Sequence, residues 1–470
     1  PARAAAPIPD AKEHDRVEWY GLSPAEHADL EREVLELFTA ILRVDTTNPP
    51  GNETACALVL QDYLAANGIE SELAGELPDR QNLVACVEGT RPGPTLLYMG
   101  HTDVVPADAA EWTVPPFSGT VKDGYVWGCG TMDMKNQVAA EAVAVARLAR
   151  SGADFAGRLR FAATCDEEDG THCGVLWLCR NRPDLVRCDY SVNEGMGGLV
   201  LPVDGHPVML LAVGEKAFAQ FTVRTRGLGG HGSVPQRERS AVLDLARAVQ
   251  ALGAADPPAI VSPTTAGFID AVVADPALAA LLKDPVTART AAYELRAADP
   301  AVASLVEPLL GATFTPTVLR AGSAVNVIPT WAEARVDCRI TPEITPDDLE
   351  GTVADILDPL GIDWEFEWFD LTDPNASPPD TPLQAAIERV LARDLPGTTL
   401  APMVSGSFTD SRWLREAFPV CVAYGIAPFV LGDLYAMDGG REHAPDERIR
   451  VDDVVYQALF YERLAREVLR

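Results

Sequence analysis

Two histidines and several carboxylates stand in this chain where their side chains could bind a metal ion. His101 and Asp103 follow the apolar run 95–99, which is typical of a buried strand. Open α/β sheets place their ligands just past the carboxyl ends of the strands. The further candidates with suitable side chains are Asp133, Glu167, Glu168, Glu194 and His443. Imidazole and carboxylate groups together bind zinc and similar divalent ions, so the sequence predicts a metal centre of the kind that hydrolases use.

The segments around these residues alternate between strands and helices. Apolar runs that predict strands occupy 83–87, 95–99, 159–164 and 190–192, and helical periodicity is found in 25–44, 53–67 and 138–150. Asp133 lies just before a helix, and Glu167 and Glu194 each follow a strand. Such alternation predicts an α/β fold with a mixed, mostly parallel sheet that is flanked by helices.

The pattern changes beyond about residue 210. The run 217–225 alternates like a half-buried strand, 325–340 contains two strand-like runs, and 257–310 is mostly helical. We therefore predict a smaller, ferredoxin-like α+β domain over 213–372, inserted into a first domain of residues 25–212 and 373–470. His443 belongs to the returning segment, so the metal site needs both parts of the first domain. Residues 1–24 are predicted to form an N-terminal tail.

Composition excludes several classes of partner and location. The formal charge of −31 argues against nucleic acids and anionic membranes, because both are polyanions. No apolar run approaches the roughly 18 to 20 residues that a membrane span needs. The nine cysteines show no paired spacing, which indicates reduced thiols rather than a disulfide framework. We therefore expect a cytoplasmic protein.

Seven short motifs follow one another in a fixed order along the chain. They are Gly100-His101-Thr102-Asp103-Val104-Val105-Pro106, Gly130-Thr131-Met132-Asp133-Met134-Lys135, Asp166-Glu167-Glu168, Asn193-Glu194-Gly195, Gly230-His231-Gly232-Ser233-Val234-Pro235, Asn326-Val327-Ile328-Pro329 and Glu442-His443-Ala444-Pro445. With these motifs, the chain resembles the family of di-zinc aminoacylases, glutamate carboxypeptidases and succinyl-diaminopimelate desuccinylases from about Thr46 to Glu447. The resemblance implies a zinc-peptidase-like catalytic domain with an inserted lid and dimerisation domain.

The same resemblance implies how the metal ligands are shared. Asp133 would bridge two divalent ions, most suitably Zn²⁺, with Co²⁺ or Mn²⁺ as substitutes. His101 and Glu194 would complete one site, and Glu168 and His443 would complete the other. Metals about 3.5 to 4 Å apart can share a hydroxide and stabilise both the attacking and the leaving oxygen.

Two carboxylates beside these ligands would have other roles by the same resemblance. Glu167 would be the general base, which takes a proton from the attacking water and passes it to the leaving amine. Asp103 would accept the second ring N–H of His101 and so fix its tautomer. Taken alone, an Asp-Glu-Glu-Asp run is more often a solvated acidic turn, and Asp133 could be a helix N-cap.

The resemblance also implies residues that contact the substrate. His231 would reach the active site of a partner subunit and stabilise the oxyanion, so a homodimer is expected. Asn326 and Arg339 would bind a substrate carboxylate, for which arginine offers a bidentate fork. Gly406 and Thr409 would line the substrate pocket. The alternatives are that His231 is an ordinary loop residue and that Arg339 is an exposed strand residue.

These residues together predict an enzyme that hydrolyses an amide. Its substrate would be an N-acyl amino acid or a small peptide whose leaving side carries a free carboxylate, and a succinyl-diaminopimelate desuccinylase activity is one alternative. A dinucleotide-binding oxidoreductase would need a third glycine after Gly128-Cys129-Gly130, and a serine hydrolase would need Gly-x-Ser-x-Gly; neither is present. A non-catalytic binding protein on this scaffold would have lost a ligand or the base, and none is lost.

Overall fold

The computed structural model describes residues 21–170, 172–429 and 442–470, and it divides into two compact units. The first unit comprises the described residues up to 214, with those of 377–403 and 409–470. The second unit comprises 215–376 and 404–408. The sequence predicts the insertion over 213–372. Of the predicted tail 1–24, residues 1–20 lie outside the described part, and a helix begins at Pro24.

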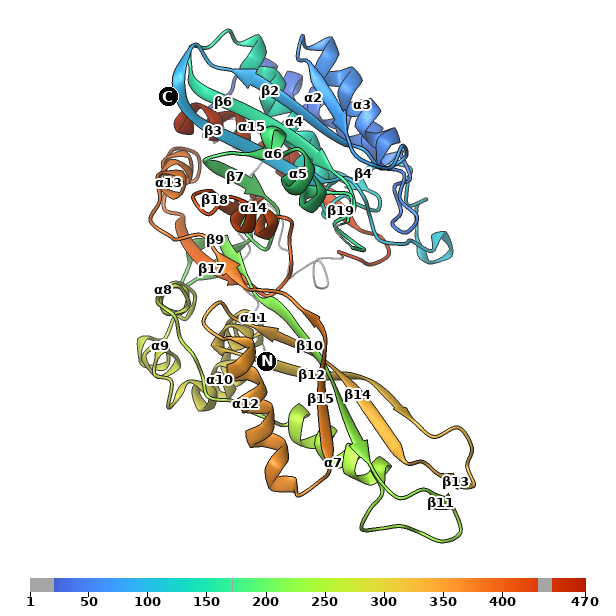
Figure 1. Ribbon diagram of the computed structural model, residues 1–470. Coiled ribbons are helices and arrows are strands. Elements are labelled where there is room, and N and C mark those ends of the chain that lie inside the picture. Colours follow the sequence, from blue (N-terminus) through green and yellow to red (C-terminus); the bar gives the residue numbers. More distant parts are fainter. Residues whose placement is uncertain (1–20, 171, 430–441) are drawn as a thin grey trace. The chain divides into compact units, whose positions relative to one another are not determined.

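A mixed sheet forms the centre of the first unit (Figure 1). Its strand order is β1 (Ser71–Ala74), β2 (Asn82–Glu88), β6 (Ala156–Thr164), β3 (Arg91–His101), β7 (Tyr190–Asn193), β18 (Val422–Gly425) and β9 (His206–Glu215). The four strands from β6 to β18 run parallel, whereas β2 and β9 join them antiparallel on either side. The predicted mixed α/β sheet is confirmed, with parallel pairing concentrated at its centre.

Helices cover both faces of this sheet. One face packs against α2 (Pro24–Leu42), α3 (Glu53–Ala66), α4 (Lys135–Arg150), α13 (Pro382–Asp394) and α15 (Val451–Val468), and the other against α5 (Val175–Asn181) and α14 (Ser411–Ala417). Leu96 and Tyr98 of β3 face the first layer, and Leu97 and Met99 face the second. Because both faces are buried, β3 reads as a continuous apolar run instead of an alternating one.

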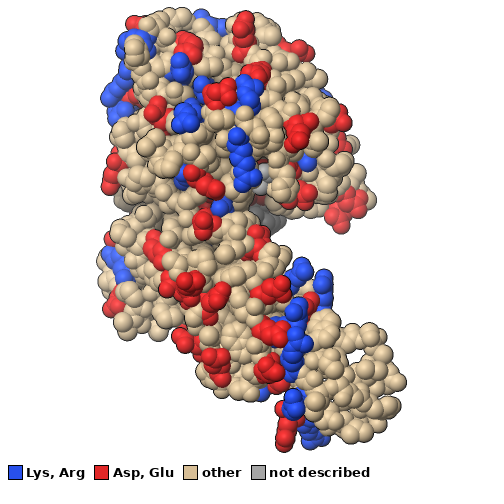
Figure 2. Space-filling view, viewed as in Figure 1, with Lys and Arg blue, Asp and Glu red and all other residues tan. Residues whose placement is uncertain are grey.

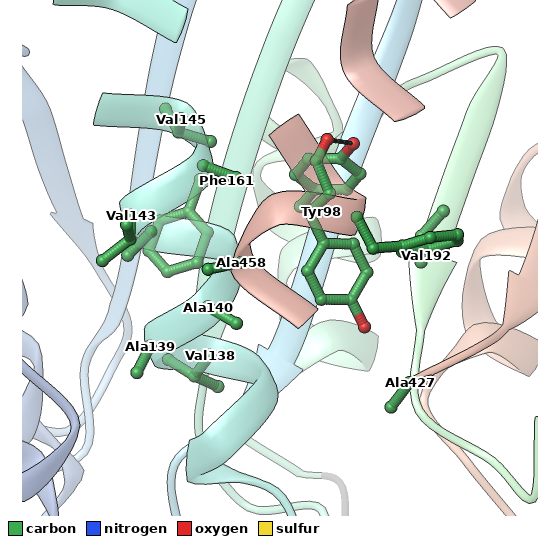
Figure 3. Packing of buried hydrophobic residues seen from close by; sticks show 14 of the residues in the cluster. Tyr98, Val138, Ala139, Ala140, Val143, Val145, Phe161, Val192, Ala427 and Ala458 are labelled. Atoms are coloured by element: carbon green, nitrogen blue, oxygen red, sulfur yellow. Dashed lines mark hydrogen bonds between the residues drawn. The ribbon is translucent and has the colours of Figure 1, made fainter. Parts of the chain in front are cut away.

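The first helix layer is assembled from segments far apart in the sequence. Figure 3 shows Tyr98 of β3, Phe161 of β6 and Ala458 of α15 in one packed cluster with Val138 at the start of α4. A Cβ at Gly100 would come within 2.6 Å of Met134 Cε, so glycine at this position lets the start of α4 lie against the end of β3. This contact brings the turn that carries Asp133 close to His101.

The second unit is an antiparallel sheet with helices on one face. Its strand order is β12 (Thr313–Ala321), β14 (Trp331–Ile340), β10 (Ala217–Arg226) and β15 (Trp364–Leu371), and α7 (Ala241–Gly253) and α12 (Pro346–Leu357) pack on it. A short ribbon pairs β11 (Gly230–His231) with β13 (Val327–Ile328). The enlargement 257–310 contains α8 (Pro263–Val272), α9 (Pro276–Lys283), α10 (Ala288–Ala298) and α11 (Pro300–Val306). Among the described residues, no helix is long and apolar enough to span a membrane.

Candidate metal centre

Loops at the carboxyl ends of the central strands carry the predicted metal ligands. His101 ends β3, Glu168 follows β6, and Glu194 follows β7. Asp133 lies in the turn before α4, and His443 lies before β19 (Arg448–Arg450). Because β6, β3 and β7 are parallel neighbours, their carboxyl ends meet at one edge of the sheet. The structure therefore brings all five side chains into one place.

The five side chains form two groups that share Asp133. His101, Asp133 and Glu194 make up one group, and Asp133, Glu168 and His443 make up the other. His101 Nε2 lies 3.0 Å from Asp133 Oδ1 and 3.5 Å from Glu194 Oε1. His443 Nε2 lies 3.1 Å from both Asp133 Oδ2 and Glu168 Oε2. The two oxygens of Asp133 therefore face different histidines, which is the arrangement of a bridging carboxylate.

Asp103 is buried behind His101 and has two structural tasks. The nearest acceptor to His101 Nδ1 is the backbone oxygen of Asp103 at 3.1 Å, whereas the Asp103 carboxylate is 3.5 Å away. This differs from the expectation that the carboxylate itself takes the ring proton. The carboxylate accepts hydrogen bonds from the backbone N–H groups of Glu167 and Glu168 and from the Asn48 amide. Asp103 thus orients His101 and also holds the loop that carries the predicted base.

The site concentrates more negative charge than its two imidazoles offset. Burial lowers the pKa of His101, but Glu194, Asp103 and Asp133 outweigh it, and the pKa lies well above its ordinary value. Burial, followed by the charge of Asp133, raises the pKa of Glu194 to about 8. Burial and the charge of Glu194 also raise the pKa of Glu167. These shifts share one physical cause, which is crowding of carboxylates in a poorly solvated site.

A pair of divalent cations fits this donor set. Two imidazole nitrogens and three carboxylates are ligands that zinc, cobalt and manganese accept. Glu168 Oε1 is buried and has no hydrogen-bond partner among the described residues, so it is an acceptor in need of a cation or donor. The backbone carbonyl of Asp103 accepts from Nδ1–H of His101, so in the neutral ring, the form that binds a metal, the lone pair is on Nε2.

The predicted substrate-contacting residues divide between the two units. His231, Asn326 and Gly406 belong to the second unit. His231 is exposed at the end of β11, and Asn326 is exposed directly before β13. Arg339 also belongs there; its guanidinium donates to Asp337 and lies 3.9 Å from the centre of the Phe218 ring. Thr409 is buried in the first unit and its hydroxyl accepts from Ser411 N, so its side chain serves a local turn.

Most of this chain matches one protein family. The model of peptidase family M20/M25/M40 matches residues 97–467. The chain belongs to this peptidase family. A succinyl-diaminopimelate desuccinylase from Methylorubrum extorquens strain PA1 is 28% identical over 441 residues, which cover 92% of this chain and 97% of the relative. The suspected family is therefore confirmed, and the protein is a metal-dependent hydrolase.

Solved structures of the M20 family share the fold. A metallo-carboxypeptidase from Sulfolobus solfataricus matches with a TM-score of 0.68 and 18% identity, covering 93% of this chain and 99% of that one. A dinuclear metal-binding peptidase from Bacillus subtilis matches with a TM-score of 0.61 and 14% identity, covering 94% and 99%. Membership of this family is inconsistent with the dinucleotide-binding and serine-hydrolase alternatives.

Two polar residues around the candidate metal centre are not predicted from the sequence. Asn48 donates to Asp103 Oδ2 at 2.9 Å and to Asp166 Oδ1 at 3.1 Å, and Glu447 contacts the turn before α4. Both lie within the stretch that the family resemblance covers. The sequence feature that could have identified them is that each is a polar residue in a turn-forming segment near a predicted ligand or strand end. Without the tertiary contacts, this feature alone does not single them out.

Proposed function

We propose that this hydrolase cleaves the amide bond of an N-acyl amino acid or a small peptide whose leaving side carries a free carboxylate. The observation that carries the proposal is the position of Asp133 between two histidine–carboxylate pairs. In the proposal, His101, Asp133 and Glu194 hold one divalent ion and Asp133, Glu168 and His443 hold the other. Zinc suits these nitrogen and oxygen ligands best.

Glu167 is the general base of the proposed reaction. Bound divalent ions supply a water of lowered pKa and polarise the amide carbonyl. Glu167 takes the proton from the attacking water and delivers it to the leaving nitrogen. Its pKa is raised by burial and by Glu194, which makes the carboxylate more basic than one in water. The Asp103 carboxylate holds the Glu167 backbone N–H, at 3.3 Å, and so supports the position of the base.

His231 has the tautomer that an oxyanion donor needs. The backbone N–H of Ser233 donates to His231 Nδ1 at 3.2 Å, and the Ser233 hydroxyl lies 2.7 Å from the same nitrogen. Since Nδ1 is the acceptor, the ring proton of a neutral His231 is on Nε2. An exposed Nε2–H is free to donate to the oxygen that develops charge during amide hydrolysis.

We also propose that the working unit is a homodimer in which His231 serves the partner's site. Exposed apolar side chains near this histidine support the proposal: Leu228, Val234, Val325 and Val327. Figure 2 shows that the region around β11 and β13 carries almost no charged side chains on the face in view. A group of exposed apolar side chains with few charges around it is typical of protein interaction sites.

Arg339 is the proposed anchor of the substrate carboxylate. Its guanidinium is held by Asp337 at 2.9 Å and stacks over Phe218, which restricts its rotamers before any ligand arrives. Gly406 leaves open space at its Cα, and Asn326 is exposed. A succinylated amino acid is one substrate within this class, and likeness to the desuccinylase from Methylorubrum extorquens favours testing it first.

A substrate panel tests the proposed function. Purified protein should contain about two metal equivalents, and it should hydrolyse some members of a panel of N-acetyl, N-succinyl and longer N-acyl amino acids and dipeptides.

Replacing Arg339 with Ala should lower kcat/KM strongly on the best substrate and far less on its methyl ester, since only the former offers a carboxylate to the arginine. Equal losses on both would show that Arg339 is structural, and an inactive, metal-free protein would overturn the proposal.

A further inference from the structure

The Glu447 side chain is buried against the turn that carries Asp133. It is 2% exposed and lies four residues after the proposed ligand His443. Its Oε2 accepts from Gly130 N at 3.0 Å, and its Oε1 accepts from Met132 N at 2.6 Å and from Asp133 N at 3.2 Å. One side-chain carboxyl group thus accepts three backbone N–H groups from four consecutive residues.

The three donors belong to the turn before α4. The first N–H groups of a helix and of the turn before it have no acceptor within the helix. Met134, at the N-cap position of α4, makes no side-chain capping bond. Gly130 has φ +84, and a Cβ there would come within 2.7 Å of Val104 Cγ1, so the turn is tightly folded. Gly130, Met132 and Asp133 all lie before the N-cap, so the Glu447 carboxylate supplies acceptors that the helix itself does not offer to their N–H groups.

The segment around Glu447 is itself firmly anchored. The Glu447 backbone oxygen accepts from Gly128 N at 3.1 Å. Asp446 accepts from the backbone N–H and the hydroxyl of Thr113, at 2.7 and 2.6 Å. From Arg448 the chain continues as β19, which pairs antiparallel with β5 (Tyr125–Trp127). Glu447 is therefore fixed on both sides of its own Cα and can act as a rigid support.

We propose that Glu447 is a positioning residue of the metal centre, which holds the backbone of Asp133 so that its two carboxylate oxygens face His101 and His443 before any metal binds. The inference rests on the proposed metal site. Asp133 contributes to both groups of ligands, so its orientation governs both ions at once. Glu447 and His443 lie on one short segment, so the same segment supplies a ligand to one group and sets the bridging residue between the two.

Glu447→Gln is the sharpest test of this role. All three contacts are N–H donors, so a glutamine amide places its NH₂ against at least one of them and loses that bond. Outer partners of metal ligands typically change metal affinity by roughly 10 to 100-fold. We expect the variant to bind both ions at least about 10-fold more weakly, measured by competition with a chelator, while the wild type binds two.

A matched control separates positioning from general stability. Glu462 on α15 is also a buried carboxylate, but its bonds are to Arg147 and Arg466, and among the described residues it is in neither group of candidate metal ligands. Glu462→Gln should lower the stability of the metal-free protein and leave both metal affinities unchanged. Glu447→Asp keeps the charge but shortens the side chain, and it should give an intermediate loss of affinity.

A measurement on the unaltered protein keeps the inference testable if Glu447→Gln does not fold. Hydrogen exchange at Met132 and Asp133 in the metal-free wild type should be slow, since both N–H groups are bonded to Glu447. Free exchange there would overturn the inference. If folded Glu447→Gln protein binds two ions with wild-type affinity, the positioning role of Glu447 is overturned and the proposed function stands. If the wild-type protein binds no metal, the proposed function is overturned as well.

Discussion

Glu167 and Glu168 are neighbours in sequence with different surroundings. Glu168 Oε2 is 3.1 Å from His443, and its other oxygen is buried without a partner among the described residues. Glu167 is surrounded by the charges of Glu194, Asp133 and Asp410, and burial raises its pKa. Adjacent side chains on one loop diverge, so the same Asp-Glu-Glu sequence can supply a ligand and a base.

Substitution of Glu167 separates chemistry from metal binding. Glu167→Gln should lower kcat by about 10² to 10⁴-fold because the amide cannot accept the proton of the attacking water. It should retain two bound ions, because Glu167 is outside both ligand groups. Asp133→Ala should lose both ions together with activity. Turnover and metal content of each variant are the measurements, and near-normal turnover in Glu167→Gln would mean that another residue is the base.

At the scale of elements, α4 and α15 are joined by a partly buried ionic contact. Arg147 of α4 donates to Glu462 of α15 at 2.7 Å, and Arg466 donates to the same carboxylate at 2.8 Å. The same helices pack around Val138 and Ala458 in the cluster of Figure 3. Arg147 lies near the carboxyl end of α4, at the other end of the helix from the Asp133 turn, so this contact stabilises the helix layer away from the candidate metal ligands.

This contact predicts a specific dependence of stability on pH. Burial raises the pKa of Glu462, but the bonds to Arg147 and Arg466 outweigh it, and the net pKa lies below its ordinary value of 4.5. A carboxylate with a lowered pKa in the folded state stabilises it fully above pH 4.5, and this stabilisation is lost as the pH falls through the lowered value.

Urea unfolding of the wild type and Glu462→Gln would measure this contribution. The wild type should be more stable by about 1 to 3 kcal/mol near neutral pH, since the carboxylate is mostly buried and accepts from two charged donors. The difference in the free energy of unfolding should remain constant down to about pH 5 and shrink below it. A difference that grows on acidification would show that the sign of the pKa shift is wrong.

At the scale of the whole molecule, the proposed dimer ties catalysis to association. A monomer would keep its metal ligands, all of which lie in the first unit, and would lack the partner's His231 as oxyanion donor. Mixing His231→Ala chains with Glu167→Gln chains tests this arrangement. Each homodimer should be inactive, whereas a heterodimer contains one site with both the base and a partner histidine.

Activity should therefore appear after subunit exchange between these two variants. The measurement is turnover of the best substrate before and after exchange, with heterodimers confirmed by tagged chains. Each variant exchanged with itself is the control. Proven heterodimers that remain inactive would show that His231 serves its own subunit, and gel filtration of the wild type as a monomer would remove the basis for the dimer.

The sequence by itself determined the local features of the catalytic unit. Strands with both faces buried, such as β3, are continuous apolar runs, and the helix starting near Pro24 has its capping box at Ser23 and Glu26. The candidate ligands His101, Glu168 and Glu194 could be predicted because each ends or follows a strand, and Asp133 because it precedes a helix. Their types and order were enough to indicate the family, since the chemistry of a metal ligand depends on the residue itself.

Only the tertiary structure decided how distant segments meet. The sequence does not show that β18 pairs with β7, that Asp103 holds the Glu167-Glu168 backbone, or that Glu447 accepts from Asp133 N across 314 positions. Nor does it show that the Arg339 guanidinium is engaged by Asp337 and Phe218. Hydrogen bonds between residues so far apart leave no periodic trace in the sequence, because they depend on the packing of whole elements and not on local backbone preference.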